Sequence, residues 1–475
     1  MAITPARLST GAIGRTSDGL PSALSSKLDG VCTADDAVVR EMLQSFREVT
    51  ADGEEAPAAG MVERVALDSD AAAPLDTVIA VGASLSSIPN PLAPHKVLGY
   101  VKVASVRLDT REVARLTSPV VNPQSVARLM QDHAHTQSAV LPMGSVRVPG
   151  KTLLQTLRHV LHATFEHFEG GALYDTLEYL VACGWDENAE PWRPKSKSRP
   201  SFLCPFCEGH VTFPRRCRRF TCRSCGVVLT LVDYLGLLTD ATEATSDSAV
   251  AMNLKGVLEH LTLLTLLRRI VDAGGSGRDA GEAAGTQPNR VLLLKDGPLM
   301  LRGQSTRLVS AVRGYLRHLD SAGVRFHLAG VEREGSFVNH CTQVDPWLTE
   351  AGVGGVFVPD NRYILERVKH AGGASAVYGR RGLYGSKAFC RVEERTTLVL
   401  SVPNRRHGIE DFAHDASCND LIGLAPTLGT LKGLISRHFP NTPLPLVAVD
   451  RLCDLPHHPY DALPGGLERL TDPAD

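Results

Sequence analysis

The sequence lacks three features that would mark broad classes of protein. No uninterrupted apolar run reaches the roughly 18 residues that a bilayer-spanning helix needs, and the N-terminus lacks a basic-then-apolar export signal. Charge of one sign is not in excess either, because 50 Lys and Arg residues are balanced by 52 Asp and Glu residues, giving a formal net charge of -2. We therefore expect a cytoplasmic protein with no membrane partner, in which any contact with nucleic acid is local.

The rest of the composition is ordinary for a globular protein, with 43% hydrophobic and 21% charged residues. At 475 residues the chain exceeds one typical domain, so we expect a main fold with insertions or appended segments. Composition divides it into a loosely ordered leader (1–60), the first part of the main domain (61–190), a basic and Cys-rich insertion (191–232) and the second part of the main domain (233–475).

Apolar patterning predicts a mixed sheet flanked by helices. Residues 77–81 and 97–108 are expected to be neighbouring, paired strands. Residues 291–296, 305–320 and 324–331 are expected to form a strand, a crossover helix and a second, parallel strand. Later strands are expected at 356–358, 388–392, 397–402 and 446–449, and further helices at 153–168, 173–182, 250–271 and 428–438. The fold class is therefore α/β or α+β.

The eleven cysteines are odd in number, and four of them form two Cys-x-x-Cys pairs. The pairs are Cys204 with Cys207 and Cys222 with Cys225, separated by residues 208–221. In a chain without an export signal, such pairs favour metal binding over disulfides. We predict a structural four-cysteine Zn²⁺ site, a zinc ribbon, which stabilises a segment too small to have its own core. The other seven cysteines are expected to pack as small apolar residues.

Basic residues surround the predicted zinc site. The insertion (191–232) has one acidic residue, Glu208. Its basic residues are Arg193, Lys195, Lys197, Arg199, Arg215, Arg216, Arg218, Arg219 and Arg223. A cationic segment with interspersed aromatic residues on an otherwise neutral chain is typical of phosphate-backbone contact. For DNA contact we select Arg215, Arg216, Arg218, Arg219 and Arg223. A solvated face or a protein-docking surface is the alternative.

One carboxylate occupies a position that is typical of ligand binding. Asp296 ends the apolar stretch 291–296 and is followed directly by Gly297 and Pro298. Ligands bind at the carboxyl ends of parallel strands, because side chains and helix N-termini converge there. An Asp that only initiates a turn before Gly-Pro is the alternative.

Two blocks of the sequence resemble the NurA family of nucleases. Residues 291–340, with VLLLKDGPLMLRG and HLAGVEREGSFVNH, are similar to the family's second catalytic block, and residues 79–109, with IAVGASLS and VLGYVKVASVRLD, are similar to its first. The likeness extends patchily over residues 76–456. It implies a ribonuclease H-like mixed sheet flanked by helices, here with an inserted zinc ribbon. It also implies a centre of two Mn²⁺ or Mg²⁺ ions that degrades DNA, a homodimer, and a HerA-like hexameric ATPase as partner.

The resemblance also suggests which carboxylates hold the metal. Two divalent ions about 4 Å apart activate water and stabilise the leaving oxygen, and such hard cations prefer oxygen ligands. Asp296 matches the family's metal-binding Asp. Glu259, within a leucine-rich helix, is the candidate for the family's helix-borne Glu, although a solvent-facing Glu is the alternative. Asp450, expected directly after a strand, lies where the family often places a His, and a simple strand-ending Asp is the alternative.

The departure from the family pattern is Gly82. The family has an acidic residue at this position, at the end of its first strand, whereas glycine offers only backbone, which cannot offset two cations. Either Asp76 or another acid substitutes for it, or the site is inactive. Glu332 could bind metal or form a substrate-facing pair with Arg333, but a surface ion pair is the favoured interpretation.

Two main hypotheses about function result. The first is a metal-dependent DNA nuclease that processes DNA ends with the ATPase, in DNA repair or anti-phage defence; Asp296 favours it. The second is a catalytically inactive DNA-end-binding adaptor of the same ATPase, which Gly82 favours. A zinc-ribbon transcription regulator would leave most of the chain unexplained.

Overall fold

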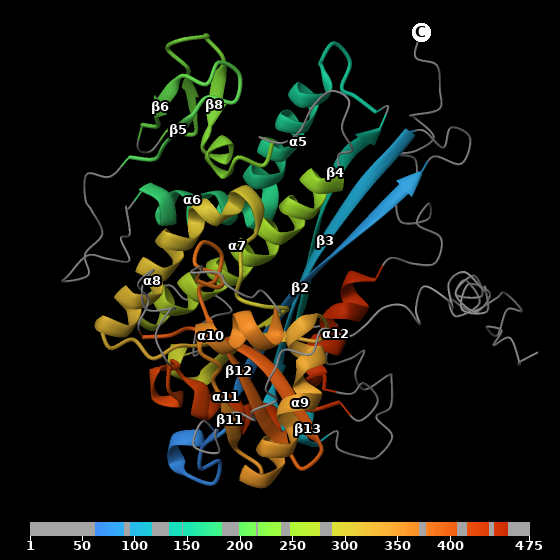
Figure 1. Cartoon of the computed structure of the whole chain (residues 1–475). Coiled ribbons are helices and arrows are strands. Elements are labelled where there is room, and N and C mark those ends of the chain that lie inside the picture. Colours follow the sequence, from blue (N-terminus) through green and yellow to red (C-terminus); the bar gives the residue numbers. More distant parts are fainter. Residues whose placement is uncertain are drawn as a thin grey trace, which may run out of the picture. The chain divides into compact units, whose positions relative to one another are not determined.

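The computed structural model describes residues 62–89, 96–115, 133–144, 146–182, 199–214, 217–238, 248–275, 287–369, 377–405, 416–436 and 441–454. The predicted leader, residues 1–60, lies outside these ranges. Nine strands form one mixed sheet in the order β1-β11-β12-β13-β10-β9-β2-β3-β4 (Figure 1). They are β1 (Val62–Arg64), β2 (Thr77–Pro89), β3 (Lys96–Asp109), β4 (Ala134–Gly144), β9 (Val291–Asp296), β10 (His327–Glu332), β11 (Gly355–Phe357), β12 (Ser386–Glu393) and β13 (Thr396–Val402).

Helices cover both faces of this sheet. They are α3 (Thr110–Arg115), α5 (Leu153–His167), α6 (Ala172–Ala182), α7 (Ser248–Gly275), α8 (Val309–Ser321), α9 (Ser336–Ala351), α10 (Asn361–Tyr363), α11 (Leu424–Lys432) and α12 (Leu444–Cys453). Central strand β9 runs parallel to both of its neighbours, β10 and β2. The remaining neighbours in the sheet pair antiparallel. The predicted class, a mixed α/β sheet flanked by helices, is confirmed.

Side chains of β2 alternate between two apolar cores. Ile79 and Val81 belong to the core that contains the leucines of α7, whereas Val78 and Ala80 belong to the core that contains α11 and α12. Figure 1 shows α7 and α12 on opposite sides of β2. Because consecutive strand residues point to opposite faces, each strand delivers neighbouring residues to different surroundings. This alternation decides how the charged residues at the strand ends are paired.

Helix α7 is long and apolar enough to cross a membrane, but 72% of its apolar window is buried inside the structure. Leu254, Leu258 and Leu261 of this helix are completely buried in the core that also contains residues of β2 and β3. The burial is that of a core helix, and the helix predicted at residues 250–271 is confirmed.

Most predicted elements are present, but the strand predicted directly before Asp450, a candidate metal ligand, was wrong. β2 and β3 pair antiparallel as expected, and β9, α8 and β10 form the predicted strand, helix and parallel strand. Residues 446–449, however, lie in helix α12 and not in a strand. A short apolar run does not distinguish the two, and prolines at 443 and 445 suit the first helical turn, where a missing N–H costs nothing. The helix predicted at 428–438 instead begins at Leu424 and ends at Lys432.

The zinc-ribbon segment consists of two short hairpins, β5 (Ser201–Leu203) with β6 (His210–Thr212) and β7 (Arg219–Thr221) with β8 (Val228–Thr230). Phe202, Phe213 and Leu229 are buried in the same core as α5, α6 and α7. The ribbon therefore shares the main core on one side.

Candidate functional site

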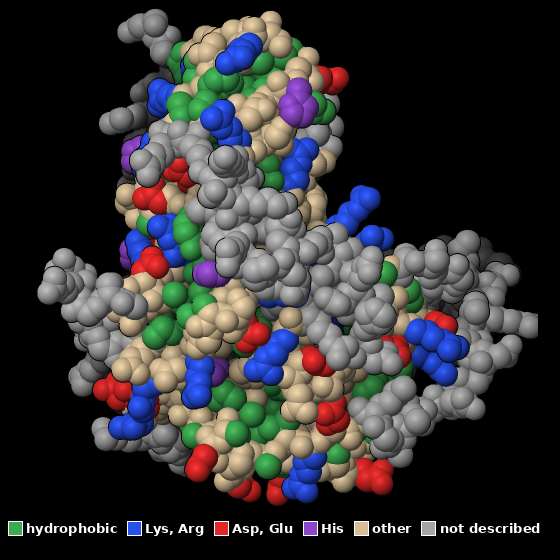
Figure 2. Space-filling model, turned by 90° about the vertical axis from the view of Figure 1, so that its left-hand side faces the viewer, with side chains coloured by type: hydrophobic (Ala, Val, Ile, Leu, Met, Phe, Trp, Pro, Cys, Tyr) green, Lys and Arg blue, Asp and Glu red, His purple; other side chains and the backbone are tan. Residues whose placement is uncertain are grey.

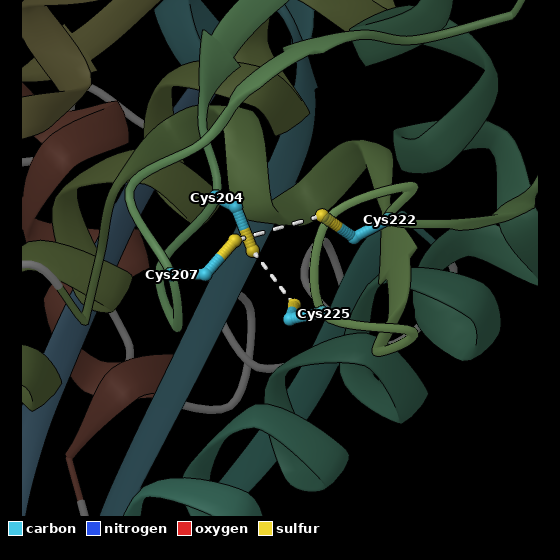
Figure 3. Close-up of side chains that lie close together, drawn as sticks. All are labelled: Cys204, Cys207, Cys222 and Cys225. Atoms are coloured by element: carbon cyan, nitrogen blue, oxygen red, sulfur yellow. Dashed lines mark hydrogen bonds between the residues drawn. The ribbon is translucent and has the colours of Figure 1, made fainter.

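The four predicted zinc ligands converge. All four sulfur atoms lie within 4.8 Å of one another, with Cys204 Sγ 3.8 Å from Cys225 Sγ and Cys207 Sγ 3.7 Å from Cys222 Sγ (Figure 3). The two turns repeat one geometry, since the N–H of Glu208 donates to the Cys204 carbonyl and the N–H of Gly226 donates to the Cys222 carbonyl. These sulfurs could hold a structural metal such as zinc, which has four thiolate ligands in closed sites.

Local hydrogen bonding prepares one thiol for a metal. Backbone N–H groups of Cys225 and Ser224 lower the pKa of Cys222 to about 6, because they stabilise the thiolate. Burial acts in the opposite direction on Cys204 and raises its pKa. Metal binding must therefore displace protons from part of the cluster.

The basic residues selected for DNA contact are partly paired within the chain. Arg218 lies 3.2 Å from Asp175 Oδ1 and over the ring of Tyr174, and Arg219 lies 3.8 Å from Glu166 Oε2. Of the others, Arg223 is exposed, whereas Arg215 and Arg216 lie outside the described residues. On the face shown in Figure 2, basic side chains are interspersed with acidic ones and form no uniform basic surface. DNA contact by the ribbon stays a prediction.

A cleft of about 1040 Å³ opens between α7, the ends of β9 and β10, and the start of α9. Its cations are Lys255, Lys295, Arg302, Arg333, Lys369 and Lys387. Its carboxylates are Glu259, Asp296, Glu332 and Glu334. Two of the predicted metal ligands, Asp296 and Glu259, thus line one cavity.

Arg333, which directly follows β10, holds two of the predicted ligands. Its Nε and Nη2 donate to the two carboxylate oxygens of Asp296 at 2.9 and 2.7 Å. Its Nη1 and Nη2 donate to the two oxygens of Asp450 at 2.5 and 3.0 Å. Burial lowers the pKa of Arg333, but the hydrogen bonds that it donates to Asp450 and Asp296 raise it, and the pKa is raised on balance. The structure therefore brings Asp296 and Asp450 together around a guanidinium.

Glu259 is paired on the other face of the sheet. Its Oε2 lies 3.0 Å from Lys295 Nζ, and the two side chains are only 8% and 5% exposed, so the solvent-facing alternative was wrong. Burial raises the pKa of Glu259, while Lys295 lowers it. Lys295 and Asp296 are consecutive, so alternation sends the lysine to α7 and the aspartate to α12.

Glu332 pairs with Lys387 and not with Arg333, so the expected surface pair was wrong. The two side chains are 10% and 1% exposed, which makes this a buried ion pair. Alternation again explains the result, because consecutive Glu332 and Arg333 point to opposite faces. Burial lowers the pKa of Lys387, and the nearby cations Lys369 and Arg302 lower it further, while Glu332 raises it.

Gly82 lies on β2, beside the strand that ends in Asp296. A Cβ at this position would lie 3.5 Å from Asp296 Cβ but only 2.5 Å from Val449 Cγ1. The side chain of Val449 therefore occupies the space that a carboxylate at position 82 would need. Asp76 does not substitute for it, because Asp76 pairs with Arg290 at the other end of β2. Five residues of β9 separate that end from Asp296, or about 16 Å at strand rise.

The carboxylates in this arrangement do not fit a two-ion centre. Within the described ranges, the four cysteines are the one group of three or more His, Cys, Asp or Glu ligand atoms that gathers within 4.8 Å. A divalent ion needs several convergent oxygens, and here the oxygens of Asp296 and Asp450 are hydrogen-bonded to Arg333, while Glu259 is paired with Lys295. Each of these three carboxylates is instead paired with a cation of the chain, and Arg333 is shared by two of them.

Once these pairs are formed, the cleft retains an excess of positive charge. Lys255, Arg302 and Lys369 form no ion pair in the part of the chain that the structure describes, although Lys369 donates to Ser336 Oγ. Sequence analysis missed these cations because they come from separate segments. It could have placed Arg333 near Asp296, since parallel neighbours β9 and β10 end at the same sheet edge.

Comparisons with protein-family models, curated proteins and solved structures find no match to this chain.

Proposed function

We propose that this chain is a NurA-like DNA-end-binding protein that does not hydrolyse DNA, an adaptor for a HerA-like hexameric ATPase in DNA repair or anti-phage defence. The proposal includes the ribonuclease H-like fold, the homodimer and the cytoplasmic location that the sequence resemblance implies. One observation carries it: Asp296, Asp450 and Glu259, the expected catalytic ligands, are each held in an ion pair, the two aspartates by Arg333 and the glutamate by Lys295.

The strength of these pairs argues against a centre that takes up two ions readily. A guanidinium that is bidentate to two carboxylates is among the stronger arrangements in proteins. Removing one partner of a buried pair such as Lys295–Glu259 costs about 3–5 kcal/mol, because it leaves an uncompensated charge. At position 82, where the resemblance would place a further acidic ligand, an added Cβ would lie only 2.5 Å from Val449 Cγ1.

The chemistry of the cleft favours a polyanionic strand as ligand. Lys255, Arg302 and Lys369 can contact phosphates, and the half-buried ring of Tyr378 lines the same cavity, whereas Phe337 beside it is buried. Cationic grooves with aromatic side chains bind single-stranded DNA by phosphate contact and base stacking.

Binding of a fluorescent single-stranded oligonucleotide tests the proposal. We expect the triple variant Lys255→Glu/Arg302→Glu/Lys369→Glu to bind at least ~10-fold more weakly and to lower the salt slope by about 2, because phosphate contacts release counterions. The matched control is Arg325→Glu, an exposed residue before β10 at the opposite end of that strand. Equal affinity of the triple variant and the wild-type chain would refute the cleft as the DNA site.

A second candidate is the active two-metal nuclease. It is favoured by the convergence of Asp296 and Asp450 on one group, since those oxygens would meet a metal if Arg333 moved away. Manganese-dependent degradation of linear DNA by the wild-type chain, lost in Asp296→Asn, would replace our proposal with this one.

A further inference from the structure

We infer that Arg333 takes the place of a divalent metal ion at the edge of the sheet. Its guanidinium lies between Asp296 and Asp450, where such an ion would bind. The wild-type chain therefore excludes the ion, and loss of Arg333 admits it. This inference concerns the chain's own charges and stands or falls independently of whether the cleft binds DNA.

The geometry is that of a cation with four oxygen contacts. Arg333 reaches both oxygens of Asp296 and both oxygens of Asp450, at distances of 2.5 to 3.0 Å. The three groups come from three elements: the end of β9, the residue after β10, and α12. The guanidinium thereby holds α12 to the sheet edge, a role that bound ions fulfil elsewhere by linking carboxylates from separate segments.

Charge balance makes the arginine replaceable by an ion. In the part of the chain that the structure describes, Arg333 forms the ion pairs of both Asp296 and Asp450, and no other Lys or Arg forms one with either. Without it, two carboxylates would face one another uncompensated, which is unfavourable unless one is protonated or a cation binds. A divalent ion supplies more charge than the lost guanidinium and prefers these oxygens.

The site is also accessible to solvent. The side chains of Arg333, Asp296 and Asp450 are 26%, 27% and 38% exposed, so an ion can enter without unfolding of the core. The neighbouring Lys295 remains committed to Glu259 on the opposite face, and its ammonium also donates to the backbone carbonyl of Asp296.

Manganese titration of the zinc-loaded full chain, followed by the electron paramagnetic resonance of free Mn²⁺, tests the inference. We expect Arg333→Gln to bind Mn²⁺ saturably, with a dissociation constant at least ~10-fold below the highest concentration at which the wild-type chain still shows no saturable binding at these aspartates, a gain of more than about 1.4 kcal/mol. Arg333→Gln/Asp450→Asn should lose this gain. The matched control is Arg290→Gln, which breaks the pair of Arg290 with Asp76 at the opposite end of strands β2 and β9. This variant should bind Mn²⁺ as the wild type does.

Two results would overturn the inference. One is saturable Mn²⁺ binding by the wild-type chain that Asp296→Asn abolishes, because the ion would then enter with Arg333 in place. The other is a folded Arg333→Gln chain, judged by circular dichroism, with no gain in binding. Should that variant not fold, Arg333→Lys replaces it. A lysine is a point charge without the planar fork, so we expect it to release one aspartate and to bind Mn²⁺ more tightly than the wild type.

Discussion

The four-cysteine cluster and the carboxylate edge of the sheet, which comprises Asp296, Asp450 and Glu259, were both predicted to bind metal. The two sites differ in how their ligand atoms are paired. In the cysteine cluster, the sulfur atoms of Cys204, Cys207, Cys222 and Cys225 lie within 4.8 Å of one another. At the carboxylate edge, Arg333 lies between Asp296 and Asp450, and Lys295 is paired with Glu259. Residue type alone does not define a metal site, because the cations nearby decide whether the ligand atoms are free.

The largest expected effect concerns the cysteine cluster. Cys222→Ser should abolish stoichiometric zinc and destabilise the ribbon, since structural zinc sites contribute on the order of 10 kcal/mol of apparent binding free energy at neutral pH. Bound zinc by mass spectrometry and the melting temperature are the measurements. Cys217→Ser is the matched control, because Cys217 is in the same segment but donates to the carbonyl of Arg219, a bond that serine can keep. Equal zinc content in both variants would contradict a four-cysteine site.

The next effect concerns the buried pair at the carboxylate edge. Lys295→Met should lower the free energy of unfolding by about 3–5 kcal/mol, because it leaves Glu259 buried and unpaired. Urea denaturation measures this. The control is Lys255→Met, since Lys255 is half-buried and forms no ion pair within the described ranges. Lys295→Met/Glu259→Leu should recover most of the loss, since apolar side chains can replace a buried pair. No recovery in the double variant would show that the pair is not the cause.

A smaller effect is expected at the position of the missing acid. Gly82→Asp should destabilise the chain by about 1–3 kcal/mol, because its Cβ meets Val449 Cγ1 at 2.5 Å. The same substitution in a Val449→Ala background should cost less, as the methyl groups are then absent. Thermal unfolding of the four chains in this cycle measures the coupling. Additive effects would mean that Val449 does not fill the site.

The smallest expected effect concerns Asp76, which pairs with Arg290 at the end of β2 remote from Asp296. The hydrogen bond from Arg290 lowers the pKa of Asp76 below its ordinary value of 3.8. A carboxyl with a lowered pKa stabilises the fold above its unfolded pKa, and this contribution is lost as pH falls through the folded value. We therefore expect wild-type stability to fall below about pH 4 and Asp76→Asn to flatten that part of the profile. Identical profiles would contradict the pairing.

The sequence predicted the frame of this molecule well where patterns were long or chemically specific. The parallel unit of β9, α8 and β10 was found from its apolar runs, and the zinc cluster from its Cys-x-x-Cys pairs. The element that carries Asp450 was wrong, because four apolar residues satisfy both a strand and a helix. The pairing of charges could not be predicted from spacing alone, since Arg333, Lys295 and Lys387 meet partners from distant segments or opposite faces.

A crystal structure of the zinc-loaded chain grown with excess Mn²⁺, with anomalous diffraction at the manganese edge, tests the central claim most directly. Our account predicts no manganese peak beside Asp296, with Arg333 bridging Asp296 and Asp450. Manganese between the two aspartates, with the Arg333 side chain turned away, would contradict it.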